Sequence, residues 1–173
     1  CLISSSIYLI NDSLDIESDR SHPTKKYRPI AAGKITIKLA LFAAINLIII
    51  SLISSYFISP SLSLILILYL VIQINYCIIL KEKPLLDIMC IASGFLLRAI
   101  AGGVASDLII SPWFLLTVGL LALFLGLEKR KAELRNINNG IVTRKVLKRY
   151  SLPLLLRLES LVATSSFVTY SLW

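Results

Sequence analysis

The sequence is short of charged residues and of the side chains that most often serve soluble catalysts. Asp, Glu, Lys and Arg make up only 16% of its 173 residues, whereas soluble domains carry about 25%. It has a single His and three Cys. Cys1, Cys77 and Cys90 are too scattered for a metal-binding motif or a disulfide framework. These shortages disfavour a soluble globular enzyme and a disulfide-stapled domain.

Long apolar runs take the place of the missing polar residues. Hydrophobic residues make up 57% of the chain, and the mean hydropathy is +0.82. A membrane-spanning helix needs about 20 apolar residues, and five nearly charge-free stretches are of that order, at 39–58, 62–80, 85–106, 109–127 and 152–173. Leu and Ile run unbroken rather than alternating with polar residues, which disfavours an outer-membrane barrel. We therefore predict an all-α, polytopic transmembrane helix bundle with about five full spans and a partial first helix over residues 1–10.

The net charge of +8 is concentrated in three segments, and this distribution predicts how the helices are oriented. Lys and Arg occur in segments 11–34, 81–83 and 128–149, whereas the connections at 59–61 and 107–112 have neither. With five spans, all three basic segments fall on one side of the membrane. The positive-inside rule makes that side cytoplasmic. The basic residues between 135 and 149 are equally well explained as topology signals alone.

Asp12, Asp15 and Asp19 form the most specific pattern in the sequence. Their spacing of three and four residues places them on one face of a helix, with Asn11 four residues before Asp15. We expect the helix over residues 1–10 to continue past the membrane surface and present this row. Like charges at that spacing repel, and Mg²⁺ removes the repulsion because it binds carboxylates together with substrate phosphates. The row predicts a site for Mg²⁺ and a diphosphate, with the three aspartates as metal ligands and catalytic residues.

A basic segment follows the aspartates at once. His22 precedes Pro23 and is interpreted as a helix-end residue, since the position before a proline disfavours the helical conformation. Lys25 and Arg28 come next, three residues apart, and both side chain types bind phosphate. Gly33 permits a tight turn before the next helix. The alternative is an ordinary polar loop of mixed charge, but such a loop need not place its acids on one helical face.

The strings NDSLDIESD and KKYRPIAAG, at residues 11–19 and 25–33, resemble the NDxxDxxxD and KxxRP signature of the UbiA superfamily of intramembrane prenyltransferases. This resemblance implies a bundle of nine spans around a central cavity, with the aspartates holding Mg²⁺ on a diphosphate-bearing substrate. Both ends of the chain lie inside apolar runs, and no signal peptide precedes Cys1. We expect residues 1–173 to be a single UbiA-like membrane domain and a fragment that lacks the first span and the last spans.

Two further strings resemble one branch of that superfamily. Many members have a second Asp-rich motif in the later cytoplasmic loop, where this chain has LEKRKAELRN at residues 127–136. That string, together with GFLLRAIAGG at residues 94–103, resembles the decaprenyl-phosphate phosphoribosyltransferase branch. The resemblance implies phosphoribosyl diphosphate as the Mg²⁺-bound donor and a polyprenyl phosphate as the acceptor. The product would be a lipid-linked sugar that serves as a cell wall precursor.

Arg98 lies inside an apolar stretch, where a charged residue usually faces the bundle interior or a wet cavity. Asp87 lies eleven residues earlier, about three helical turns away, and therefore on nearly the same face. One interpretation is that Arg98 faces a polar cavity and binds phosphate or orients a carboxylate. The other is a structural ion pair with an acidic residue on a neighbouring helix.

A second basic cluster follows the stretch 109–127. We expect Lys129 and Arg130 to bind the donor phosphates and Glu133 to contact the metal or the ribose hydroxyls. Lys129 and Glu133 are four residues apart, so a salt-bridged helix end is the alternative. Lys81 ends another span on the same predicted side and is a further phosphate-binding candidate, and we assign Asn11 to the same substrate-binding set.

These patterns predict a Mg²⁺-dependent transferase in a bacterial inner membrane, with its active-site loops cytoplasmic and its lipid acceptor entering from the bilayer. Within the superfamily, the alternative is prenyl transfer from a prenyl diphosphate to an aromatic or other small acceptor. The alternative from another class is a small membrane transporter, which the surface position of the acids disfavours. No nucleic-acid partner is expected, because topology and phosphates explain the basic loops. The apolar exterior suits lipid and a homo-oligomer alike.

Overall fold

The structure is a computed structural model that describes residues 1–138 and 150–173, with side chains described as far as Arg135 in the first range. All regular secondary structure in these two ranges is helical, which confirms the predicted all-α class. Several of the basic residues interpreted as topology signals, namely Arg144, Lys145, Lys148 and Arg149, lie outside the described residues.

Five of the helices are long and apolar enough to cross a membrane, which confirms the predicted number of spans. Two short helices precede them, α1 (Leu2–Leu14) and α2 (Ile16–Ser21), followed by the 3-10 turn η1 (Lys25–Tyr27). A second 3-10 turn, η2 (Leu80–Glu82), separates the second span from the third. The spans are α3 (Ile37–Ile58), α4 (Pro60–Ile78), α5 (Leu86–Ala105), α6 (Pro112–Asn138) and α7 (Leu152–Leu172).

Helix α6 extends well past the apolar stretch from which it was predicted. The charge-free run ends at Leu127, but the helix continues to Asn138. Lys129, Arg130 and Glu133 therefore lie on a continuous helix, which fixes how they are spaced around its axis. Because Arg130 and Glu133 are three residues apart on that helix, they lie on one side of it.

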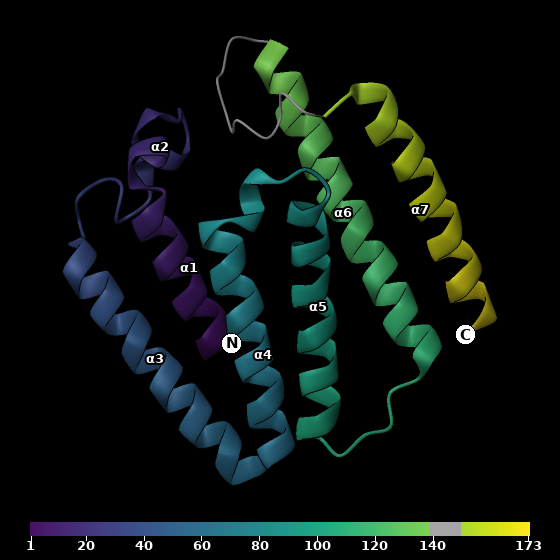
Figure 1. Cartoon of the computed structure of the whole chain (residues 1–173), viewed down its shortest axis with the longest axis horizontal. Coiled ribbons are helices and arrows are strands. Elements are labelled where there is room, and N and C mark those ends of the chain that lie inside the picture. Colours follow the sequence, from purple (N-terminus) through teal and green to yellow (C-terminus); the bar gives the residue numbers. More distant parts are fainter. Residues whose placement is uncertain (139–149) are drawn as a thin grey trace. The chain divides into compact units, whose positions relative to one another are not determined.

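The described residues form two compact units, Cys1–Cys77 and Ile78–Trp173. That the two units make up a single membrane domain stays a prediction. In the first unit, α1 packs along α3 (Figure 1). The buried positions of α3 include Ala40 and Ala44, and small residues spaced four apart let two helices approach closely. A hydrogen bond of 3.2 Å between the hydroxyls of Ser4 and Tyr69 connects α1 to α4.

Helix α6 lies between α5 and α7 in the second unit (Figure 1). Its contact with α5 is close, because a Cβ atom added at Gly126 would lie 2.8 Å from Cγ2 of Ile88. Its contact with α7 includes a buried hydrogen bond of 3.3 Å from the hydroxyl of Thr117 to that of Thr169. Ile88 also belongs to a buried apolar cluster with Leu127, Tyr150, Leu155 and Val162.

The two glycines of α6 that face α5 provide a matched test of this packing. Gly126→Ala places a methyl group 2.8 Å from the branched side chain of Ile88, whereas Gly119→Ala places one at an ordinary 3.4 Å from Leu96. Overpacking of this kind costs about 2 kcal/mol. We expect Gly126→Ala to lower the thermal midpoint in detergent and Gly119→Ala to leave it unchanged or raised. Equal midpoints for the two variants would contradict this account of the α5–α6 contact.

Candidate functional site

The aspartate row lies on two helical segments. The helix does continue beyond residue 10, as predicted, but α1 ends at Leu14 and α2 begins at Ile16. At Asp15 the backbone has φ −94° and ψ 12°, which is the sparsely populated bridge region. The expectation of one uninterrupted helix through Asp19 is therefore wrong. Asp12 belongs to α1, Asp19 belongs to α2, and Asp15 occupies the break between them.

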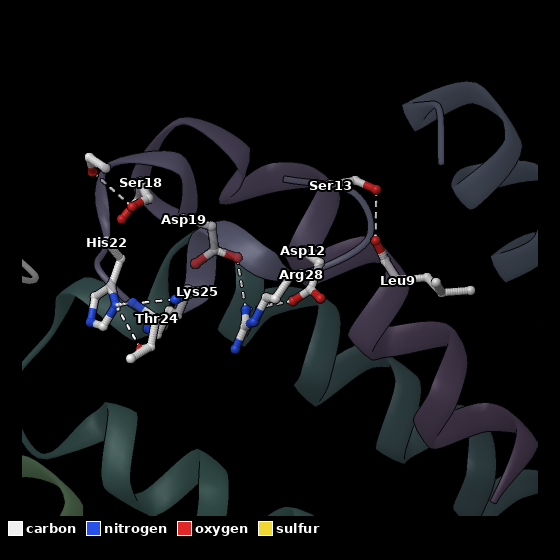
Figure 2. Close-up of polar contacts among 10 residues, drawn as sticks. Leu9, Asp12, Ser13, Ser18, Asp19, His22, Thr24, Lys25 and Arg28 are labelled. Atoms are coloured by element: carbon white, nitrogen blue, oxygen red, sulfur yellow. Dashed lines mark hydrogen bonds and ion pairs between the residues drawn. The ribbon is translucent and has the colours of Figure 1, made fainter. Parts of the chain in front are cut away.

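Arg28 joins the two segments through the carboxylates of Asp12 and Asp19. Its Nη1 atom donates to Oδ1 of Asp12 and to Oδ2 of Asp19, each at 2.8 Å (Figure 2). The Asp19 side chain is only 4% exposed, while those of Asp12 and Arg28 are 23% and 38% exposed. One nitrogen therefore contacts two carboxylates, one of which is almost completely buried. Residues that the sequence assigned to metal binding and to phosphate binding contact each other directly.

Burial raises the pKa of the Asp12 carboxyl above its ordinary value. Arg28 opposes the rise in pKa and the nearby carboxylates of Asp19 and Asp15 add to it. The ionised form of Asp12 is therefore disfavoured, and additional positive charge nearby would stabilise it.

These residues suit a divalent cation in their chemistry. Two carboxylates that converge on one point are the ligands Mg²⁺ prefers, and the position between them is already occupied by positive charge. The side-chain oxygen of Asn11 is buried and has no hydrogen-bond partner among the described residues, so it has an acceptor lone pair to offer. The described residues nevertheless contain no group of three His, Cys, Asp or Glu side chains that could hold a metal. The structure thus brings together two of the three predicted metal ligands, Asp12 and Asp19.

The basic segment is held in shape by its own side chains. Nδ1 of His22 accepts hydrogen bonds from the backbone N–H groups of Thr24 at 3.3 Å and Lys25 at 3.4 Å (Figure 2). Helix α2 ends at Ser21, so the interpretation of His22 as a helix-end residue is confirmed. Gly33 has φ +75°, as the predicted tight turn requires. This scaffold places Lys25 at the start of η1, one helical turn before Arg28.

The second basic cluster contains a fully buried ion pair. Arg130 and Asp87 are both 0% exposed, and Nε of Arg130 donates to Oδ2 of Asp87 at 2.5 Å. Nη1 of Arg130 donates to Oε2 of Glu133, also at 2.5 Å. The hydroxyl of Tyr150 donates to Oδ1 of Asp87 at 2.6 Å. Burial and this hydrogen bond raise the pKa of the Tyr150 hydroxyl. Arg130 therefore joins α5 to α6.

Lys131 forms a second ionic junction one residue further along α6. Its ammonium group donates to the carboxylates of Glu128 on the same helix and Glu159 on α7. Lys129, by contrast, is exposed. Of the three consecutive basic residues at 129–131, Lys129 is thus the most exposed.

The remaining predicted residues lie in the second unit. The guanidinium of Arg98 lies 4.5 Å from the ring centroid of Phe95, and its Nε donates to the carbonyl of Gly94 at 3.0 Å. Asp87 pairs with Arg130 on the neighbouring helix. Lys81 lies in η2 and is partly exposed. That Lys81, Arg98 and the other basic residues bind substrate stays a prediction.

Sequence reasoning missed Tyr150, Glu128 and Glu159 as parts of these networks. Glu128 and Lys131 are three residues apart on one helix, so their spacing alone could have indicated that pair. The partners of Tyr150 and Glu159 are distant in sequence, and no local pattern could have identified them.

The chain is similar over its whole length to proteins of one family. The model of the UbiA prenyltransferase family matches residues 1–166. A decaprenyl-phosphate phosphoribosyltransferase of Mycolicibacterium smegmatis is 45% identical over 174 residues, which cover 100% of this chain and 55% of that protein. A protein of the same name from Corynebacterium glutamicum is 40% identical, over 100% of this chain and 53% of that protein. The chain therefore spans about half the length of these curated relatives.

Solved structures share the fold. A UbiA homologue from Archaeoglobus fulgidus bound to DMAPP and Mg²⁺ matches with a TM-score of 0.83 and 17% identity, over 98% of this chain and 62% of that one. The same kind of homologue bound to GPP and Mg²⁺ matches with a TM-score of 0.82 and 17% identity, over 98% of this chain and 61% of that one. At this identity the likeness concerns the fold alone, and it confirms the predicted arrangement of helices.

Arg28→Gln tests the bridge between the two carboxylates. The substitution removes an opposing charge, so the pKa of folded Asp12 rises further above its unfolded value. A group with a raised folded pKa destabilises the fold once the pH exceeds that pKa, and has no effect where it is protonated in both states. We expect the free energy of unfolding in detergent to fall by about 2 kcal/mol near neutral pH. The difference from the parent protein should shrink as the pH is lowered toward about 4.

Lys26→Gln is the matched control, because Lys26 is exposed and lies over the ring of Tyr27 instead of beside a carboxylate. It removes the same charge from the same segment. Thermal melts of both variants across the pH range separate the bridge from a general charge effect. An equal loss in the two variants would contradict the role assigned to Arg28.

Proposed function

The chain belongs to the UbiA prenyltransferase family, and we propose that it provides the diphosphate-binding site of an intramembrane phosphoribosyltransferase. The donor is phosphoribosyl diphosphate, the acceptor is a polyprenyl phosphate, and the group transferred is 5-phosphoribose. One observation supports this choice above others: 45% identity to a decaprenyl-phosphate phosphoribosyltransferase over the entire chain. The lack of a second Asp-rich motif at residues 127–136 agrees with it.

Asp12 and Asp19 are proposed to hold Mg²⁺ on the donor diphosphate, with Asn11 and Asp15 beside them. The cation would supply charge neutralisation for the departing pyrophosphate. Its fit rests on the convergence of two carboxylates on one point and on the unpartnered oxygen of Asn11. Two structures of a UbiA homologue from Archaeoglobus fulgidus, bound to Mg²⁺ with DMAPP or GPP, support the same choice of metal.

Lys25, Arg28, Lys81 and Lys129 are proposed to neutralise donor phosphates. Arg28 is already directed at the carboxylates that would face the diphosphate, and a guanidinium binds phosphate oxygens in a bidentate manner. Arg130 and Glu133 are proposed to brace α6 against α5, because Arg130 pairs with both Asp87 and Glu133. Arg98 remains a candidate for the lipid phosphate.

The reaction proceeds by displacement at C1 of the ribose. An oxygen of the polyprenyl phosphate forms the new bond to C1 while the C1–O bond to pyrophosphate breaks, and the electron pair leaves with pyrophosphate. The fixed positive side chains stabilise the charge that develops on the leaving group, in a site of low dielectric. The lipid phosphate is already ionised near neutral pH, so no strong general base is needed. A mechanism without a strong general base suits this chain, because its single His already accepts hydrogen bonds from backbone N–H groups at the start of η1.

The chain is an integral membrane protein, and its lipid partner would reach the site from the bilayer. The five spans expose many large apolar side chains, among them Phe42, Phe57 and Phe167, as lipid-facing helices do. We propose that the basic segments face the cytoplasm, because the positive-inside rule assigns them there. A bacterial inner membrane is proposed because the relatives that suggest the substrate are bacterial proteins.

Prenyl transfer from a prenyl diphosphate to a small acceptor is the second candidate. A digeranylgeranylglyceryl phosphate synthase of Methanosphaera stadtmanae supports it, at 35% identity over 48% of this chain and 30% of that protein. This similarity extends over less of the chain than the phosphoribosyltransferase similarity and is weaker in identity. Phosphoribosyl transfer is therefore the proposal we prefer.

A donor comparison tests the proposal directly. The purified protein in detergent, with Mg²⁺ and a polyprenyl phosphate, should convert labelled phosphoribosyl diphosphate to a lipid-soluble product. We expect at least about tenfold less product from labelled prenyl diphosphates, because the ribosyl and prenyl groups place different demands on the site. Turnover of a prenyl diphosphate alone would instead establish the second candidate.

Asp12→Asn and Asp19→Asn test the metal-binding carboxylates without changing side-chain size. Each removes one negative charge from the site, and we expect transfer to fall by about 10³-fold at saturating Mg²⁺. Glu17→Gln is the control, since Glu17 is exposed on α2 and the change removes the same charge. Retained activity in Asp12→Asn, or an equal loss in Glu17→Gln, would refute the metal assignment.

A further inference from the structure

Leu85 has a backbone conformation that is unfavourable for its side chain. It precedes α5 and has φ +66° and ψ −42°. Positive φ is uncommon outside glycine and a genuine outlier for a bulky residue, because Cβ is forced close to the backbone. Such conformations persist only where the surroundings impose them, and they cluster at functional sites. Some contact in the second unit must therefore hold Leu85 in place.

That contact is the hydroxyl of Tyr150. The backbone N–H of Leu85 donates to this hydroxyl at 2.6 Å, and the hydroxyl in turn donates to Oδ1 of Asp87 at 2.6 Å. Tyr150 is 6% exposed, so water does not readily replace either bond. Asp87 is held from its other side by Arg130 at 2.5 Å. The strained residue is thus connected, through one tyrosine, to a buried ion pair between α5 and α6.

The conformation of Leu85 determines how the preceding segment meets α5. That segment contains η2 with Lys81, followed by Lys83 and Pro84. Within it, the N–H groups of Glu82 and Lys83 donate to the carbonyls of Ile79 and Leu80 at 3.3 and 3.1 Å. Only the N–H of Asp87, which donates to the carbonyl of Lys83 at 3.2 Å, bonds it to the first turn of α5, and Pro84 has no N–H to contribute. A change of φ at Leu85 would therefore alter the angle at which η2 and Lys81 meet α5.

We propose that Tyr150 is a positioning residue, whose hydroxyl keeps Leu85 at positive φ and thereby orients the segment that carries Lys81. The effect on catalysis rests on the proposed function of Lys81 in phosphate binding. The effect of the Tyr150 hydroxyl on the backbone of residues 80–87 does not depend on that function.

The first measurement is amide hydrogen exchange in detergent, which needs no activity. Tyr150→Phe removes the hydroxyl and keeps the ring in its apolar cluster with Ile88 and Leu155. We expect exchange to accelerate at least about tenfold in residues 80–87, where the Leu85 N–H loses its acceptor. Tyr170→Phe is the control, because Tyr170 is exposed and only its ring contacts Trp173. Unchanged exchange in residues 80–87 of Tyr150→Phe would overturn the proposal.

The second measurement separates positioning from general stabilisation of the buried ion pair. Tyr150→Phe should raise the KM for phosphoribosyl diphosphate about tenfold with a much smaller change in kcat, the pattern of lost ground-state binding. Leu85→Gly makes positive φ accessible without strain, so the hydroxyl is no longer needed to impose it. In a Leu85→Gly background, adding Tyr150→Phe should therefore change KM less than about threefold. An equal rise in KM in both backgrounds would mean that the hydroxyl only stabilises Asp87, and would overturn the proposal.

These outcomes remain distinct from failure of the proposed function. If the parent protein transfers no phosphoribose, the function is wrong, while hydrogen exchange still decides whether Tyr150 holds Leu85. If Tyr150→Phe alone does not fold, the Leu85→Gly, Tyr150→Phe double variant provides the test. Recovery of folded protein supports the proposal, because the strain has been removed, and failure to recover overturns it.

Discussion

A charge that is removed from water must meet an opposite charge, and this constraint determines the organisation of both units. Moving an unpaired ion from water into a protein interior costs too much free energy to be tolerated. Removing one partner of a buried ion pair destabilises the fold by about 3–5 kcal/mol. The chain has only 28 charged residues among 173, yet Asp19, Asp87, Arg130 and Lys131 are buried. Asp87 and Arg130 are 0% exposed and lie 2.5 Å apart. Once this pair exists, α5 and α6 cannot slide along each other without separating it.

The same constraint applies in a milder form to the aspartate row. Asp12 and Asp19 come from separate helical segments, and Arg28 keeps both within 2.8 Å of one nitrogen. The guanidinium of Arg28 thus lies between two carboxylates, and His22 and Gly33 shape the turn that follows α2. The unfavourable charge of the row, which led to the prediction of a metal, is partly offset by Arg28. One negative charge of the two carboxylates is left for a cation to neutralise.

Local patterns predicted the fold well and the contacts within it less completely. The five spans depend on uninterrupted apolar runs, so hydropathy alone located them. The break at Asp15 lies between the two segments that Arg28, thirteen residues later, connects, and the sequence showed only a row of acids followed by a basic segment. For Asp87, the sequence showed only that Arg98, eleven residues away, lies on nearly the same helical face. The actual partner, Arg130, is 43 residues away, a distance at which only tertiary packing decides. Tyr150 resembles any aromatic residue near the start of a helix and offered no signal.

The Arg28 bridge also has a consequence for biogenesis. Many small metal sites fold only when the ion is present, because their ligands repel one another without it. Here the counter-charge is covalently part of the chain, sixteen residues from Asp12 and nine from Asp19. The turn over residues 12–28 can therefore assemble as soon as these residues have emerged from the ribosome. Its assembly during membrane insertion would be indifferent to the local concentration of divalent ions.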